Sequence, residues 1–137
     1  AYEKQILSWV KKLKLENRVL MVRDASFVDL PKIYRLASLF VYPSLFEGFG
    51  IPIVEAITCG IPVITSKGSC FSEAGGPGCI YINPQEEEEL AHAIELVLGD
   101  QEKQEQMKEL SLQHIQRFEP SVIADDLTNL YIRLVRG

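Results

Sequence analysis

Two glutamates with seven residues between them, Glu47 and Glu55, enclose a glycine-rich turn and are the residues best suited to chemistry. The stretch reads E-G-F-G-I-P-I-V-E. Gly48 and Gly50 lack a Cβ, so the backbone there can adopt unusual dihedral angles and let a ligand come close. Pro52 suits the first turn of a helix, where its missing N–H is no loss. The sequence therefore predicts a helix that begins directly after the turn.

Such a helix would point the free backbone amides near Phe49, Gly50 and Ile51 outward, together with the positive end of its dipole. Phosphate groups bind readily at helix ends of this kind. Carboxylates repel phosphate, so Glu47 and Glu55 are better suited to accepting hydrogen bonds from hydroxyl groups. A ligand with both phosphates and hydroxyls, such as a nucleotide sugar, fits the combination. The alternative interpretation is that the two glutamates only favour the start of a helix.

Two other phosphate-binding motifs match this turn poorly. A dinucleotide fingerprint needs a third small residue, but Gly50 is followed by Ile51, Pro52 and Ile53. A Walker A loop needs Gly-Lys-Ser/Thr, which does not follow here. A pair of glycosidase carboxylates stays open, because sequence spacing does not give the distance between two carboxyl groups. That interpretation leaves the glycine-rich helix start unexplained.

The elements around the turn are predicted to place it where a strand ends and a helix begins. Residues 37–44 have the pattern of a buried strand, and residues 53–59 have the apolar spacing of a buried helix. Open α/β sheets bind their ligands at the carboxyl ends of their strands. Helices are predicted at 2–14, 29–36, 51–58, 85–98, 101–118 and 121–135, and strands at 18–22, 39–42, 62–65 and 79–82. This alternation predicts an α/β fold, a Rossmann-like parallel sheet flanked by helices.

The segment 66–78 contains three glycines and is predicted to be a mobile turn. Lys67 in this segment could reach a phosphate, although a solvated lysine is the simpler interpretation. The acidic run 86–89 is predicted to occupy the first turn of a helix, where the dipole favours negative charge.

The composition is that of one globular unit. With 47% hydrophobic residues the 137-residue chain can form a single core. A net charge of −5 without a basic tract argues against nucleic acid as a partner, and no apolar run approaches a membrane span. Cys59, Cys70 and Cys79 lack metal or disulfide spacing, so reduced, partly buried thiols are expected. His92 and His114 are expected on helix surfaces, and no cluster predicts a metal.

The run SLFVYPSLFEGFGIPIVEAITCGIPVITS resembles the signature of the retaining glycosyltransferases of family four, the group 1 type, which share the two-domain GT-B fold. Softer similarity covers LPKIYRLA upstream and CIYINPQEEEELAHAIELVL downstream. The positions in register with the family motif are Pro43-Ser44, Glu47-Gly48-Phe49-Gly50, Pro52, Glu55-Ala56 and Gly60-Ile61-Pro62-Val63-Ile64.

The resemblance implies a role for each residue of the turn. Glu55 would bind the ribose hydroxyls of the nucleotide, and Glu47 would be the catalytic residue that contacts the transferred sugar. The amides around Phe49, Gly50 and Ile51 would hold sugar hydroxyls or the distal phosphate.

Further residues are assigned by the same resemblance. The loop after the strand 18–22 would lie near the nucleobase, which makes Arg23 a candidate substrate-binding residue, although the family usually has a glycine there. Glu73 matches a family position near the donor, with a plain turn or cap role as the alternative. The basic Arg and Lys pair that neutralises the donor diphosphate in this family has no counterpart here.

That absence predicts that residues 1–137 are a single partial nucleotide-sugar-binding domain, the incomplete C-terminal half of a GT-B glycosyltransferase. The first two strand–helix units and the N-terminal acceptor domain would be missing. We expect such a fragment to be inactive alone. It would either pair the strand 18–22 directly with the motif strand or self-associate, because bare strand edges invite pairing.

The function implied is transfer of a hexose from a nucleoside-diphosphate sugar to a hydroxyl acceptor, with retention and in polysaccharide or glycoconjugate synthesis. The acceptor would be a glycan or lipid-linked sugar, and neither a metal nor another cofactor is expected. The expected location is the cytoplasm, with contact to the inner face of the membrane left open. The alternative is a non-catalytic nucleotide-sugar-binding or partner subunit that kept the fold.

Overall fold

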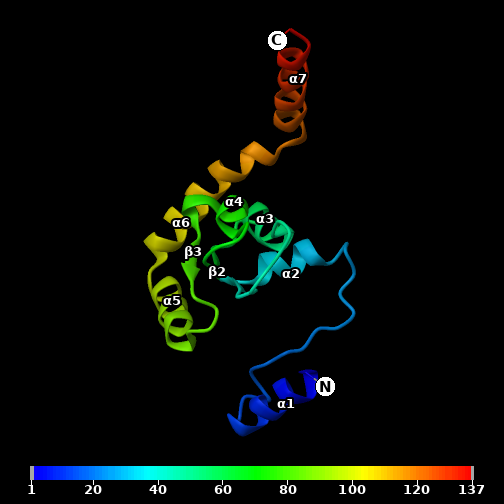
Figure 1. The fold of residues 1–137 in the computed structure, drawn as a ribbon. Helices are drawn as coiled ribbons and strands as arrows, with labels where there is room; N and C mark the ends of the chain where they lie inside the picture. The colour runs from blue at the N-terminus through cyan, green and yellow to red at the C-terminus, as the bar shows by residue number, and fades with distance from the viewer. Residues whose placement is uncertain (1, 137) are drawn as a thin grey trace.

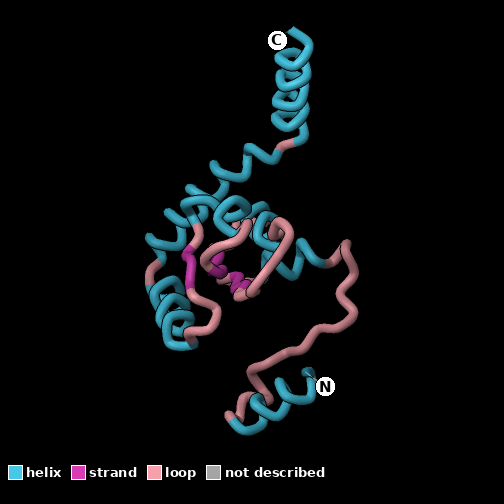
Figure 2. Tube along the Cα trace, in the orientation of Figure 1, coloured by secondary structure: helices cyan, strands magenta, loops and turns pink. Residues whose placement is uncertain are grey.

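The computed structural model describes residues 2–136, and its body is a three-stranded parallel sheet (Figures 1 and 2). The strands are β1 (Phe40–Tyr42), β2 (Val63–Ser66) and β3 (Ile80–Ile82), in that spatial order. Val41 lies opposite Ile64, and Ile64 lies opposite Ile80. Helical segments connect the strands, as parallel pairing requires. The predicted α/β fold with a parallel sheet flanked by helices is confirmed.

The helices follow the chain around the sheet. The first is α1 (Tyr2–Lys12), and α2 (Leu30–Leu36) precedes β1. Between strands lie α3 (Ile51–Thr58), then α4 (Phe71–Gly75) with the 3₁₀ turn η1 (Gly76–Gly78). After β3 come α5 (Glu87–Gly99), α6 (Gln101–Ile115), the 3₁₀ turn η2 (Gln116–Phe118) and α7 (Pro120–Arg136).

The core has two clusters that share β2. Val63 belongs to one cluster and Ile64 to the other, because successive side chains of a strand point to opposite faces. Every residue of β2 is buried, which is typical of a central strand covered on both faces. The first cluster is Ile53, Ala56, Ile57, Val63, Phe71, Ala74 and Cys79, and the second is Ile64, Ile82, Ala93, Val97 and Met107.

The strand predicted at 18–22 is wrong. Residues 19–26 form an extended, exposed stretch between α1 and α2 that belongs to no sheet. Leu20 is 86% exposed and Val22 is 59% exposed. The β-prone sequence has no neighbouring strand to supply hydrogen bonds, so propensity alone does not make it a strand. The expectation that it pairs directly with the motif strand β1 is also wrong, since β1 pairs with β2.

The segment 66–78, predicted to be a mobile turn, instead contains α4 and η1. Its Phe71 and Ala74 are fully buried. The glycines allow close packing: a Cβ on Gly76 would lie 2.2 Å from the His114 ring, and one on Gly78 would lie 2.5 Å from the Met107 carbonyl oxygen. Glycine here therefore marks a close approach between segments rather than flexibility.

The two terminal helices differ from the body. Neither α1 nor α7 has a buried residue, and α7 extends away from the sheet (Figure 1). Both are amphipathic, and α7 exposes apolar side chains such as Leu127 and Val135. Within residues 2–136, no helix combines the length and the apolar character needed to span a membrane.

Candidate functional site

The glycine-rich turn follows β1 and leads directly into α3, as predicted. Gly50 is the N-cap of α3 and has a φ of +99°, a left-handed conformation that favours glycine. A Cβ on Gly50 would lie 3.2 Å from Ile53 Cδ1 and 3.3 Å from Ala74 Cβ. The turn therefore needs glycine at this position for both its conformation and its packing. Gly48 meets no such restriction, since a Cβ there would have nothing within 4 Å.

Neighbouring segments fix the backbone of the turn. The Ser66 hydroxyl donates to the Ser44 carbonyl at 2.6 Å. The Cys70 thiol donates to the Glu47 carbonyl at 3.3 Å. These donors come from the end of β2 and from the loop after it, so the turn is attached to the second strand as well as to its own. The amide end of α3 is held in place by the sheet edge rather than by the turn alone.

The Glu47 carboxylate is held from the strand side. Its Oε1 accepts a hydrogen bond from the Tyr42 hydroxyl at 2.5 Å and another from Ser44 Oγ at 3.0 Å. The bond to Glu47, with burial, raises the pKa of Tyr42 to about 12, so the hydroxyl keeps its proton and remains a donor. A groove of ≈ 440 Å³, which we call the turn groove, is lined by Tyr42 and residues 47–52.

The Glu55 carboxylate lies on the opposite side of the helix start. Its Oε2 accepts a hydrogen bond from the Tyr34 hydroxyl of α2 at 3.1 Å. Burial, followed by this bond, raises the pKa of Tyr34 to about 12. A second groove of ≈ 360 Å³, the α2–α3 groove, is lined by Phe27, Leu30, Pro31, Tyr34, Arg35, Phe49, Ile51, Val54, Glu55, Thr58 and Cys59.

The two grooves share Phe49 and Ile51 but hold one glutamate each. Glu47 lines the turn groove and Glu55 lines the α2–α3 groove. A pair of glycosidase carboxylates would line one cleft across a single bond. The observed separation fits a ligand that passes over the helix start and meets a different carboxylate at each end.

The structure places Arg23 away from both grooves. Its guanidinium forms an ion pair with Glu3 of α1, in the exposed stretch before α2. Its substrate-binding role stays a prediction. The same stretch does bring Phe27 into the α2–α3 groove. Sequence analysis did not single out Phe27, Tyr34 or Tyr42, although tyrosines near a glutamate motif are donors that could have been noticed.

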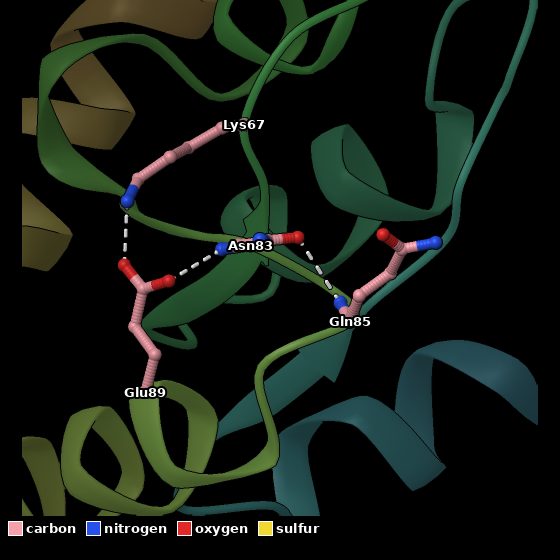
Figure 3. A network of polar contacts seen from close by, with 4 residues as sticks. All are labelled: Lys67, Asn83, Gln85 and Glu89. Carbon is pink, nitrogen blue, oxygen red and sulfur yellow. Dashed lines mark hydrogen bonds and ion pairs between the residues drawn. The ribbon is translucent and has the colours of Figure 1, made fainter.

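Lys67 is engaged by an acidic neighbour rather than left alone. Its Nζ lies 2.5 Å from Glu89 Oε1, and the Asn83 N–H donates to Glu89 Oε2 at 2.8 Å (Figure 3). The Lys67 bond and then the Asn83 bond hold the pKa of Glu89 below its usual value. Asn83 in turn accepts from the Gln85 N–H at 3.1 Å. This network joins the loops after β2 and β3, and the acidic run begins α5 as predicted.

Aromatic packing joins the turn to the end of α6. The Phe49 ring meets Phe118 edge-on at 5.2 Å, and Phe118 meets His114 at 5.9 Å. His114 Nε2 lies 2.7 Å from the Glu73 carbonyl oxygen. The prediction of a surface position holds for His92, which is exposed, but is wrong for His114, which is half-buried against Gly76. The small size of Gly76 is the physical reason, because it lets the imidazole ring pack inward.

The cysteines are free thiols. Cys79 is buried and its pKa is raised to about 11 by that burial, whereas Cys59 and Cys70 are half-buried. Within residues 2–136, the side chains of His, Cys, Asp and Glu form no group of three that could hold a metal ion.

A parallel α/β sheet with a glycine-rich helix start at its carboxyl edge defines a Rossmann-like protein. The profile of the family described as "Glycosyl transferases group 1" matches residues 1–113. The chain therefore belongs to the group 1 glycosyltransferase family.

Similar proteins include several bacterial sugar transferases. The chain is 38% identical over 93 residues to the O-antigen chain mannosyltransferase RfbU of Salmonella typhimurium, a match that covers 68% of this chain and 26% of that protein. It is 38% identical over 88 residues to the mannosylfructose-phosphate synthase of Agrobacterium fabrum, covering 63% of this chain and 19% of that protein. The chain thus spans about a quarter of these relatives or less.

Solved GT-B structures share the fold. A sucrose-phosphate synthase from Thermosynechococcus elongatus superposes with a TM-score of 0.83 at 29% identity, covering 97% of this chain and 34% of that one. HepE from Anabaena, solved in complex with UDP, superposes with a TM-score of 0.85 at 28% identity, covering 96% of this chain and 37% of that one. The chain therefore has the fold of about a third of a GT-B glycosyltransferase.

Proposed function

We propose that this chain contributes the donor site of a retaining glycosyltransferase of family four. The reaction is transfer of a hexose from a nucleoside-diphosphate sugar to a hydroxyl acceptor. The observation that carries the proposal is the pair of grooves that meet at the amide end of α3, each with one glutamate. HepE, which has been solved with UDP and with UDP-glucose, supports this donor class.

The proposed roles follow from the two grooves. Glu55 in the α2–α3 groove binds the ribose hydroxyls, and Glu47 in the turn groove binds the transferred sugar. The amides of Phe49, Gly50 and Ile51 hold the distal phosphate or sugar hydroxyls between them, because a helix start favours negative charge. Catalysis rests on stabilising the charge that develops on the departing diphosphate.

The acceptor and the setting are part of the same proposal. The names of relatives such as the O-antigen chain mannosyltransferase support a glycan or lipid-linked sugar as acceptor and a role in polysaccharide synthesis. We place the reaction in the cytoplasm and expect it to need no metal. A non-catalytic subunit that kept the fold is the second candidate, since the basic pair typical of the family has no counterpart in this sequence.

The full-length gene product, supplied with nucleoside-diphosphate hexoses of different bases, provides the test. We expect acceptor-dependent release of the nucleoside diphosphate that persists with a chelator, and a product whose anomeric configuration by NMR matches the donor's. Inversion would refute the retaining assignment. Donor binding without release would favour the non-catalytic subunit.

We also propose that the 137 residues alone do not transfer sugar and do not stay monomeric. Support comes from the free outer edge of β1 and from apolar side chains at high exposure, such as Phe27 at 88% and Val135 at 86%. Light scattering of the 15.5 kDa chain should show a larger species. A stable monomer with transferase activity would contradict both parts.

A further inference from the structure

We propose that Tyr42 is a positioning residue that fixes which oxygen of Glu47 faces the donor sugar. The inference rests on the proposed function and deepens it, because it concerns how the turn groove recognises a sugar hydroxyl. Tyr42 lies in β1, outside the glycine-rich motif itself.

The two hydrogen bonds to the carboxylate converge on one oxygen. The Tyr42 hydroxyl and Ser44 Oγ both donate to Glu47 Oε1, at 2.5 and 3.0 Å. Within residues 2–136, Oε2 takes part in no hydrogen bond, and no buried side-chain oxygen lacks a partner. Oε2 is therefore accessible from the groove. A carboxylate held through one oxygen presents the other as an acceptor with a defined direction.

The donors are themselves held in place. The Tyr42 ring stacks on Phe40 with centroids 5.8 Å apart and planes 14° apart, and its carbonyl accepts from Thr65 Oγ1 at 2.9 Å. The Ser44 carbonyl accepts from Ser66 Oγ at 2.6 Å. Both donors are thus attached to β2, the fully buried strand. Because the core fixes the two hydroxyls, it also fixes the orientation of the Glu47 carboxylate.

Glu55 shows the same arrangement in the other groove and supplies the matched control. Its Oε2 accepts from the Tyr34 hydroxyl, and Tyr34 packs edge-on against Phe40 at 5.2 Å. One tyrosine therefore serves each glutamate. If the grooves divide the donor as proposed, removing the Tyr42 hydroxyl should affect the sugar step, and removing the Tyr34 hydroxyl should affect nucleotide binding.

The experiment compares Tyr42→Phe and Tyr34→Phe in the full-length gene product. Each change keeps the ring and removes only the hydroxyl. A hydrogen bond to a charged group, when lost, changes an equilibrium or rate about tenfold to hundredfold. We expect Tyr42→Phe to lower kcat by this factor while the affinity for the bare nucleoside diphosphate stays within about twofold. Tyr34→Phe should do the reverse, with the larger change in nucleotide affinity.

A set of deoxy donor sugars sharpens the test. One of them should react much more slowly than its parent with the wild type but only slightly more slowly with Tyr42→Phe, because the lost hydroxyl no longer meets an oriented oxygen. Ser44→Ala, which removes the second donor to Oε1, should show the same pattern in weaker form.

Unchanged kcat in Tyr42→Phe, or equal losses of kcat and nucleotide affinity, would overturn the inference. Thermal unfolding of each variant separates these results from misfolding. A wild-type protein that binds donors but transfers no sugar would instead contradict the proposed function.

Discussion

The turn groove and the α2–α3 groove share the start of α3 but are built from different materials. The turn is attached to β2 and to the loop after it by hydrogen bonds to its backbone. The α2–α3 groove takes one wall from α2 and from Phe27, which is 88% exposed and follows the extended stretch 19–26. The sugar side of the proposed site is thus formed by the core, whereas the nucleotide side depends on a weakly packed segment.

The largest expected effect comes from forcing a side chain into the turn. Gly50→Ala should destabilise the fold by about 1–3 kcal/mol, because alanine is strained at positive φ and its Cβ would press on Ile53 and Ala74. Donor binding should be lost with it. Gly48→Ala is the matched control and should change the unfolding midpoint little, because its Cβ meets open space. Similar midpoints for both variants would show that the turn is not held as described.

The next effect separates the two grooves directly. Glu47→Gln keeps the size of the side chain but removes the charge that accepts sugar hydroxyls. We expect kcat to fall about tenfold to hundredfold, while nucleoside diphosphate binds nearly as in the wild type. Steady-state kinetics beside a binding titration measure both quantities. Equal losses would mean that Glu47 acts on the nucleotide or only supports the turn.

A smaller effect is expected from alkaline pH, and it should reach both grooves together. The pKa values of Tyr34 and Tyr42 are raised to about 12 from an ordinary value of 10.0. The folded state thus favours the protonated hydroxyls, so their stabilising contribution is complete below pH 10 and is lost as the pH rises toward 12. Thermal unfolding midpoints across this range should fall less steeply in the Tyr42→Phe variant. An equally steep fall would contradict the assigned hydrogen bond.

The smallest effect should come from Lys67. Because Glu89 already engages its ammonium group in an exposed ion pair, Lys67→Met should leave donor affinity within about twofold of the wild type. A donor titration measures this, with His92→Gln as a control at an exposed position outside both grooves. A large loss of affinity in Lys67→Met alone would show that the lysine leaves Glu89 to bind phosphate.

The difference between the grooves also explains what could be predicted from the sequence. The bounds of α3 follow from Gly50 and Pro52, because their constraints are local. The glutamates could be named for the same reason. Pairing with Tyr34 and Tyr42 could not, because Tyr34 is 21 positions from Glu55 and comes near it only through packing.

Two errors share one cause. The segment 18–22 has strand-like composition, but a strand forms only beside a partner, and β1 presents its paired edge to β2. The glycines of 66–78 look like a flexible turn, but Gly76 and Gly78 are small so that α6 can pack closely. In both segments the outcome depends on what lies next to the chain in space, and local sequence does not encode it.

Calorimetric titration of the full-length gene product with nucleoside diphosphates tests the central claim most directly. Wild type, Glu55→Ala and Glu47→Gln are measured side by side, with unfolding midpoints to confirm that each is folded. Loss of one charged hydrogen bond should weaken nucleotide binding about tenfold to hundredfold in Glu55→Ala and hardly at all in Glu47→Gln. Unchanged affinity in Glu55→Ala would remove Glu55 from the site and contradict the division of the donor between two grooves.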